Sequence, residues 1–169
     1  MTKGKIYIKH VSTPAGGMIL GAYEDRLCLC DWDKETRRKR MDSRIEKRLN
    51  AEMEEGVSPV ITLAAKELME YFIRQRTTFD VPLLLAGTDF QTRVWNQLLT
   101  VPYGQTLSYG ELALQMGCPK AVRAVANANG ANVLSLFIPC HRVVGSDGSL
   151  TGYAGGLEAK KLLLALESR

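Results

Sequence analysis

The stretch Ile138-Pro139-Cys140-His141-Arg142-Val143-Val144 places the residue types of an activated thiol next to one another. A cysteine thiol in water has a pKa of about 8.5, so a reactive cysteine needs a base or a positive charge close to it. His141 and Arg142 follow Cys140 directly and are of the right types to supply both. Neighbouring side chains of a regular strand point to opposite faces. Cys140 and His141 can therefore act together only across a backbone bend or through a bridging water.

Two interpretations of Cys140 remain open on these residues. Pro139 before it and Gly145 after the motif favour a bend. The apolar run at residues 136–138 is instead typical of a buried strand, and a cysteine outside a disulfide is often a core residue. For Cys140 considered alone, the core interpretation is the simpler one.

The composition is that of an ordinary globular protein. The chain has 169 residues, 46% of them hydrophobic, which suffices for one large domain or two small ones. The N-terminal residues lack the apolar segment of an export signal and no stretch approaches the length of a membrane span, which predicts a cytoplasmic protein. The cysteines are then expected to stay reduced (Cys28, Cys30, Cys118 and Cys140). The net charge of +4 permits a DNA partner without requiring one.

The N-terminal residues predict a small antiparallel sheet. Residues 5–11 and 18–22 are apolar runs separated by a turn-forming segment at residues 12–17, which is typical of a β-hairpin. Residues 26–32 predict a third strand. The result is a short antiparallel meander.

Cys28 and Cys30 would lie on the same face of that third strand. With His10 they form a conceivable set of metal ligands. A Cys-x-Cys pair without a second pair at metal-binding spacing is weak evidence for zinc, however. We therefore expect no metal site.

The charged segment at residues 34–55 predicts a helix, because apolar residues recur every four positions (Met41, Ile45, Leu49 and Met53). Residues 37–40 are all basic and suggest a nucleic-acid patch. Acidic residues are interspersed along the segment, so we interpret it as a solvated helix face.

A second helix is predicted to begin with Ser58 as N-cap and Pro59 in the first helical position. It should pack on the small sheet. Its expected buried face consists of Leu63, Ala64, Leu68, Tyr71 and Phe72.

Residues 78–87 predict a linker, because Pro82 disfavours a central strand and Gly87 ends the segment. Two capping boxes follow it, one at Thr88–Gln91 and one at Ser108–Glu111, and each predicts the start of a helix. The first of these helices has an apolar face formed by Phe90, Val94, Trp95, Leu98 and Leu99.

The helix that starts at Ser108 is expected to run through Met116 and to stop at Gly117. Residues 118–120 then predict the start of another helix that runs to about Asn129. Two short helices joined by a glycine-containing turn are the layout of a helix-turn-helix, whose second helix enters a DNA groove. Helical periodicity assigns Val122 and Val125 to the core face of this second helix, and Arg123, Ala124 and Asn127 to its outward face.

Residues 138–144, with residues 152–157 after them and residues 123–125 before them, closely resemble the active site of the O6-alkylguanine-DNA alkyltransferases, also called methylated-DNA–protein-cysteine methyltransferases. The resemblance is close from about Phe90 to Glu167, whereas the N-terminal half matches only in layout. It implies an α+β fold in which residues 1–86 form a ribonuclease-H-like α/β domain with a small antiparallel sheet. Residues 87–169 would form a mostly helical, winged-helix-like domain that contains the helix-turn-helix.

The resemblance also implies a reaction. A guanine alkylated at O6, or a thymine alkylated at O4, would leave the duplex and enter a pocket, where Cys140 takes up the alkyl group irreversibly. Cys140, a water, His141 and Glu167 would form a proton relay. Tyr109 would donate a hydrogen bond to the guanine ring. One molecule would then repair one lesion.

Further roles follow from the same resemblance. Arg123 would fill the space left by the extruded base, and Ala124 and Asn127 would lie against the DNA. Asn132 would hold the turn before the reactive cysteine. The pocket and its supports would comprise Ser135, Arg142, Tyr153, Gly155 and Gly156. The implied partner is double-stranded DNA, bound by a monomer without a cofactor, a metal or a membrane.

Two other classes of protein fit parts of the sequence. A non-catalytic DNA-binding adaptor of the same fold would use the helix-turn-helix but would not need Cys140. A cysteine hydrolase would need a histidine distant in the sequence, and His10 is the sole remaining one. Weighing the protein after incubation with alkylated DNA distinguishes the three classes.

Overall fold

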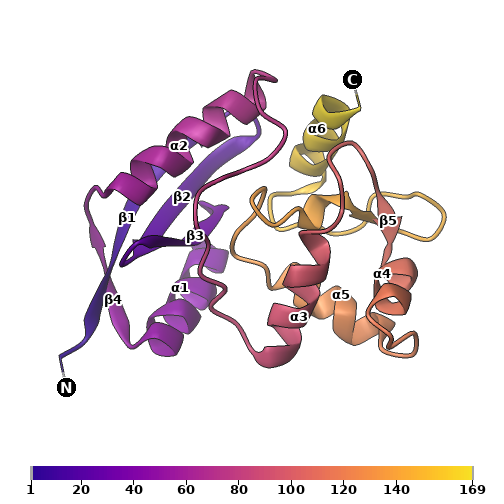
Figure 1. The fold of residues 1–169 in the computed structure, drawn as a ribbon, viewed down its shortest axis with the longest axis horizontal. Coiled ribbons are helices and arrows are strands. Elements are labelled where there is room, and N and C mark those ends of the chain that lie inside the picture. Colours follow the sequence, from indigo (N-terminus) through magenta and orange to yellow (C-terminus); the bar gives the residue numbers. More distant parts are fainter. Residues whose placement is uncertain (1, 169) are drawn as a thin grey trace. The chain divides into compact units, whose positions relative to one another are not determined.

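The structure is a computed structural model that describes residues 2–168 (Figure 1). The chain divides into two compact units, the first ending at Ala86 and the second beginning at Gly87. The fold is α+β, as predicted.

The first unit is built on a four-stranded sheet in the order β3-β2-β1-β4. The predicted hairpin is confirmed: β1 (Gly4–Thr13) pairs with β2 (Gly16–Tyr23), and Thr13 lies opposite Gly16. Gly16 has a φ of 135°, a backbone conformation that favours glycine. The predicted third strand is also confirmed as β3 (Arg26–Trp32), antiparallel to β2.

The predicted helix at residues 34–55 is wrong in its last part. Helix α1 (Glu35–Leu49) is capped by Asn50, whose φ of 48° lies in the left-handed region that asparagine tolerates. The chain continues as strand β4 (Ala51–Glu55), which is parallel to β1, so the sheet is mixed rather than purely antiparallel. Burial alternates along β4 with the period of a strand, and Met53 continued the helical spacing by coincidence.

The basic run in α1 is also not the solvated face that we predicted. The Arg37 guanidinium is nearly buried and donates to the Asp31 carboxylate at 2.8 Å, and Arg38 contacts the same carboxylate. Lys39 and Arg40 are exposed, as expected. Burial raises the pKa of Asp31, and the two arginines oppose that rise. Arg37 and Arg38 therefore hold helix α1 to strand β3 of the sheet.

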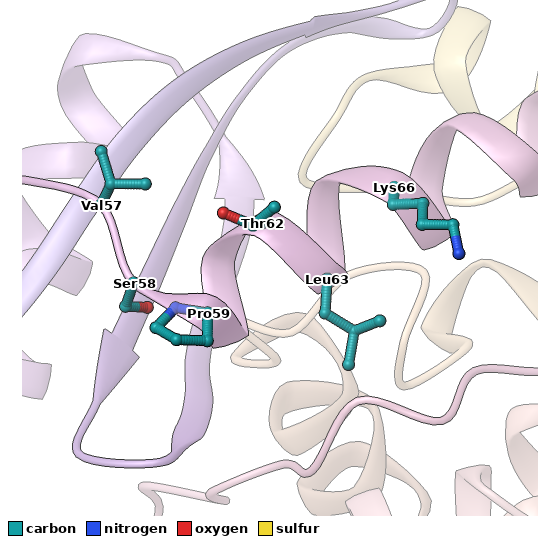
Figure 2. A pocket seen from close by; sticks show the side chains of 6 residues that line it. All are labelled: Val57, Ser58, Pro59, Thr62, Leu63 and Lys66. Carbon is teal, nitrogen blue, oxygen red and sulfur yellow. The ribbon is translucent and has the colours of Figure 1, made fainter.

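Helix α2 (Pro59–Phe72) lies on the sheet (Figure 1) and begins as predicted, with the Ser58 hydroxyl accepting from the Ile61 amide at 3.2 Å. Leu63 is only half-buried, contrary to prediction. It faces an open pocket of about 560 Å³ beside the start of the helix (Figure 2). The residues that line this pocket are Val57, Ser58, Pro59, Thr62, Leu63 and Lys66.

The segment before the second unit pairs with the edge strand β3. The Leu27 amide donates to the Pro82 carbonyl and the Leu84 amide donates to the Leu27 carbonyl, both at 2.8 Å. Proline fits there because its carbonyl is the group that pairs and no N–H is needed. The buried Glu67 carboxylate of α2 accepts from the amides of Asp80 and Val81 and holds the same segment.

The second unit contains four α-helices within the described residues: α3 (Asp89–Leu98), α4 (Tyr109–Gln115), α5 (Val122–Gly130) and α6 (Leu157–Glu167). Both predicted capping boxes are formed, at Thr88 and at Ser108. The short strands β5 (Leu107–Ser108) and β6 (Val143–Val144) are parallel. The Trp95 indole donates to the Ala128 carbonyl at 2.9 Å and joins α3 to α5. Leu99, predicted on the apolar face, is 44% exposed.

The second helix of the predicted helix-turn-helix begins later than expected. Gly117 ends the first helix with a φ of 76°, and residues 118–121 form a turn closed by the Ala121 amide on the Cys118 carbonyl at 2.9 Å. Helix α5 starts after this turn. Val122, which we expected in the core, is 37% exposed because it occupies the first position of the helix, whereas Val125 is buried.

Candidate active site

Cys140 lies on a short 3-10 helix, Cys140–Arg142, so the backbone bends at the motif as the reactive interpretation requires. The Cys140 amide donates to the Ile138 carbonyl at 2.8 Å, and the Arg142 amide donates to the Pro139 carbonyl at 3.0 Å. Cys140 is 4% exposed. The buried-strand alternative for residues 136–138 is wrong, because Leu136 has a φ of 74°.

Asn132 fixes the segment before this turn. Its side-chain amide donates to the Ile138 carbonyl at 3.0 Å, and its carbonyl oxygen accepts from the Leu134 amide at 2.9 Å. Both bonds are buried, where a hydrogen bond is costly to leave unmade. The sequence expectation that Asn132 ties down this turn agrees with this geometry.

Glu167, at the end of α6, meets the two residues that follow Cys140. Its carboxylate lies 2.7 Å from His141 Nε2 and accepts from Arg142 Nε at 2.8 Å and from Arg142 Nη2 at 3.1 Å. Arg142 also donates to the Val101 carbonyl at 2.7 Å. All three side chains are buried. The resemblance implied that His141 and Glu167 meet, and the structure brings them together. The contact of Arg142 with Glu167 was not predicted.

The hydrogen bonds define the chemical state of His141. A carboxylate paired with arginine is ionised and can only accept, so His141 Nε2 carries the proton and Nδ1 carries the lone pair. Within residues 2–168, His141 Nδ1 is buried without a hydrogen-bond partner. Burial lowers the pKa of His141, Glu167 opposes this, and the positive charges of Arg142 and Lys160 lower it further. His141 is thus a neutral base with a free lone pair.

Lys160 is a site residue that the sequence analysis missed. It is fully buried on α6, and its ammonium group donates to the Val143 carbonyl at 2.6 Å and to the Thr151 carbonyl at 3.4 Å. Burial lowers the pKa of Lys160, whereas its interaction with Cys140 acts in the opposite direction. A signal was present, because Lys160, Leu163 and Glu167 are spaced to share one face of a helix.

The predicted pocket residues come from several segments of the second unit. The Tyr109 hydroxyl is 2.8 Å from the Thr151 hydroxyl. Gly156 precedes the first turn of α6 and has a φ of 93°, a backbone conformation that a residue with a side chain would adopt only with strain. Tyr153 and Gly155 are half-buried, and the Ser135 hydroxyl is fully buried.

The predicted DNA-facing residues lie on helix α5 and not on the Cys140 turn. Arg123, Ala124 and Asn127 are exposed on α5, whereas Val125 and Ala128 of the same helix are buried. The face of the helix that is exposed to solvent therefore carries one arginine among shorter side chains. The separation of this face from the core face agrees with the sequence pattern except at Val122, which is exposed.

The conceivable metal ligands are not assembled into a site. Cys28 and Cys30 are buried in β3, and burial raises the pKa of Cys28 to about 12. The His10 ring instead lies 2.7 Å from the Asp33 carboxylate. Across residues 2–168, no three potential ligands of the His, Cys, Asp or Glu type cluster as a metal site would need.

Comparison with known proteins agrees with this geometry. Residues 89–169 match the family described as the DNA-binding domain of 6-O-methylguanine DNA methyltransferase. The constitutive methylated-DNA–protein-cysteine methyltransferase of Bacillus subtilis is 41% identical over 95% of this chain and 94% of its own length. The chain belongs to the methylated-DNA–protein-cysteine methyltransferase family.

Other members of the family are similar in sequence and in structure. The Mycobacterium tuberculosis methyltransferase is 57% identical over 62% of this chain, and the match spans 63% of that relative's length. A crystal structure of M. tuberculosis OGT in complex with DNA covers 96% of this chain at 40% identity, with a TM-score of 0.80 and 92% of its own chain matched. None of the helices within residues 2–168 is long and apolar enough to span a membrane.

Proposed function

We propose that this protein repairs DNA by moving the alkyl group of O6-alkylguanine, and of O4-alkylthymine, onto Cys140 in a single irreversible step. The observation that carries the proposal is the 2.7 Å contact between His141 Nε2 and Glu167, which leaves Nδ1 as a base beside the Cys140 turn. Membership of the methyltransferase family supports the same reaction. A non-catalytic adaptor would have no use for this arrangement.

The geometry supports a relay of the triad type. Glu167 holds His141 in the tautomer that accepts at Nδ1, and a water carries the thiol proton to that nitrogen. The Cys140 sulfur then attacks the alkyl carbon and forms a carbon–sulfur bond. The bond between that carbon and O6 breaks, its electron pair stays with guanine, and Tyr109 donates a hydrogen bond to the departing base.

Access to the lesion requires base flipping, because a stacked guanine keeps its O6 group away from a buried thiol. The exposed face of α5 supplies the groups for this step. Arg123 would occupy the space in the duplex, while the small Ala124 and Asn127 allow close approach to the groove. We assign DNA binding and alkyl transfer to the unit that begins at Gly87. We interpret the first unit as a ribonuclease-H-like domain.

The product is a thioether, which ordinary protein groups do not cleave, so each molecule should act once. We place the protein in the cytoplasm, on the nucleoid when it is bound to DNA, because a reducing compartment keeps Cys140 available as a thiol.

The test uses a duplex oligonucleotide that contains one O6-methylguanine. After incubation with excess DNA, the intact protein should gain the mass of one methyl group and no more, and peptide mapping should place it on Cys140. The Cys140→Ser variant should bind the duplex with nearly unchanged affinity and gain nothing. Methylation of Cys28, Cys30 or Cys118 in that variant, or binding without any gain in the parent, would contradict the proposal.

A further inference from the structure

The acidic residues of helix α1 do not neutralise its outer face. Asp42 forms an ion pair with Arg38, which holds the helix to the sheet, at 3.0 Å. The Glu46 carboxylate accepts a hydrogen bond from the Met53 amide of strand β4 at 2.9 Å. The acids that balance the basic run in the sequence are therefore engaged with an inner arginine and with the sheet.

Several cations of the same helix are left without an acidic partner within residues 2–168. They are Arg40, Arg44, Lys47 and Arg48, and all are exposed. Lys39, also exposed, pairs with Glu35 at 3.6 Å. The formal net charge of the whole chain is +4. This one helix face therefore holds as many unpaired positive charges as the chain has in net excess.

The helix dipole accounts for only part of this group. Lys47 and Arg48 lie in the last turn of α1, where cations stabilise the carbonyl end of a helix. Arg40 and Arg44 lie further from that end, beyond the turn over which the dipole acts. Because both are also exposed, neither the dipole nor packing uses their charges.

The four charges form a stripe along the helix. At 3.6 residues per turn, the positions from residue 40 to residue 48 that carry them fall within about 100° of the circumference and extend over about 12 Å. Duplex DNA carries one phosphate charge per about 1.7 Å of its axis, so a duplex alongside this face presents about seven phosphates over that length. Arginine predominates in the stripe, and its guanidinium can bind a phosphate through two hydrogen bonds.

The same face lacks the groups that other partners need. A helix that lies on a membrane needs an apolar face for the lipid, and the apolar residues Met41 and Ile45 of α1 are buried. Protein interfaces centre on aromatic or apolar anchors, and single-stranded RNA is held by stacking on aromatic rings. The exposed residues of α1 include neither kind of side chain. The chemistry of the face therefore fits a phosphate backbone.

We propose that the outer face of α1, formed by Arg40, Arg44, Lys47 and Arg48, is a second DNA-binding surface that holds the phosphate backbone of duplex DNA regardless of sequence or damage. The proposed function places DNA binding on the second unit, whereas this surface belongs to the first. Contacts to phosphates let a protein move along DNA, so the surface serves the search for rare lesions on undamaged duplex. The inference rests on DNA as the partner and not on the transfer chemistry.

The experiment measures the affinity of the full protein for an undamaged duplex of about 20 base pairs, by fluorescence anisotropy, at salt concentrations from about 0.05 to about 0.3 M. The test variant changes three cations of the surface: Arg40→Gln, Arg44→Gln and Lys47→Gln. The matched control changes three exposed cations of the first unit outside α1: Lys9→Gln, Arg26→Gln and Lys66→Gln. The two variants have the same net charge.

We expect the α1 variant to bind the undamaged duplex about tenfold more weakly at low salt. The slope of log affinity against log salt concentration should become shallower by about 2–3, because each phosphate contact contributes about 0.9 to it. The control variant should keep the parental slope. Both variants should melt near the parental temperature, because all the changed side chains are exposed.

A parental affinity and slope in the α1 variant would overturn the proposal. Equal losses in the two variants would overturn it as well, because net charge alone would then explain the binding. If the α1 variant fails to fold, Arg40→Gln and Arg44→Gln are measured singly, and each should make the slope shallower by about 0.9. An unchanged slope in both would contradict the proposal.

Two further ligands test the choice of partner. Vesicles of phosphatidylglycerol and phosphatidylcholine and a single-stranded RNA are compared with the duplex. Binding of either that needs the α1 cations, while binding of the duplex does not, would overturn the proposal in favour of that ligand. Methyl transfer from an O6-methylguanine duplex is measured separately in the parent. Failure of that transfer, with duplex binding still dependent on α1, would overturn the proposed function and leave this surface standing.

Discussion

Each unit of the molecule buries one glutamate on a helix, and the two carboxylates do different things. Glu67 of α2 and Glu167 of α6 are 0% and 4% exposed, and each pairs with an arginine. Glu67 also accepts from two backbone amides, those of Asp80 and Val81. Glu167 instead meets the ring of His141.

The partners explain the difference. A backbone amide cannot gain or lose a proton at ordinary pH, so Glu67 can only hold the chain in place. An imidazole titrates near neutrality, so Glu167 can control where its proton resides. Burial of a carboxylate therefore identifies an important residue but does not show whether it serves stability or chemistry. The group that donates the hydrogen bond to the carboxylate distinguishes the two roles.

The largest effect is expected from removing the base itself. His141→Phe should lower the single-turnover alkylation rate by about a hundredfold or more, the usual contribution of a positioned general base. DNA affinity should stay close to that of the parent, because His141 is buried. The rate is measured with protein in excess over an O6-methylguanine duplex, and a rate near that of the parent would remove His141 from the relay.

Glu167→Gln should lower the same rate by about tenfold to a hundredfold. The amide is no anion and can present its N–H to the ring, so it holds the His141 tautomer less well. Folding should be checked by circular dichroism. A parental rate with an intact fold would place Glu167 with Glu67, as a residue of structure only.

Glu67→Gln should do the reverse. Because its partners are amides of the neighbouring segment and Arg76, the substitution should cost about 1–3 kcal/mol in the free energy of unfolding. The transfer rate of the folded protein should not change. Chemical denaturation measures the stability and the single-turnover assay measures the transfer rate. A slower transfer with unchanged stability would contradict the purely structural role of Glu67.

The smallest expected effect is a shift in the pH at which the single-turnover alkylation rate falls on the acid side. His141 must be neutral to accept a proton, and burial lowers its pKa below 6.5, so the parent should keep its rate as pH falls past 6.5 and lose it only at lower pH. Glu167 raises that pKa. The acid-side decrease in rate should therefore move to still lower pH in Glu167→Gln and stay at the same pH in Glu67→Gln. The measurement is the single-turnover rate between about pH 5 and pH 8.5.

Local chemistry made several elements predictable from the sequence. Ser58, Thr88 and Ser108 each accept a backbone amide of the following turn, so a few neighbouring residues determine where those helices begin. The hairpin and the third strand follow equally local patterns. The Cys140 bend was indicated by the proline before it.

Other features depend on partners distant in the chain. Strand β4 forms because β1 is available beside it, which the spacing of Met53 could not indicate. Arg37 is buried because Asp31 of β3 meets it. The burial of Lys160 and Glu67 was not predicted, because only the packed structure supplies the carbonyls and amides that pair with them. The pairing of His141 with Glu167 was predicted from family resemblance, not from the residues themselves.

The pairing of Leu27 with Pro82 and Leu84 has a consequence for solubility. Strand β3 is at the edge of its sheet, and an edge strand offers unpaired backbone groups to which strands of other molecules can add. The segment ahead of the second unit covers part of that edge with two hydrogen bonds, and the proline within it resists extension of the pairing. The chain that joins the two units thus also protects the first unit against strand-to-strand aggregation.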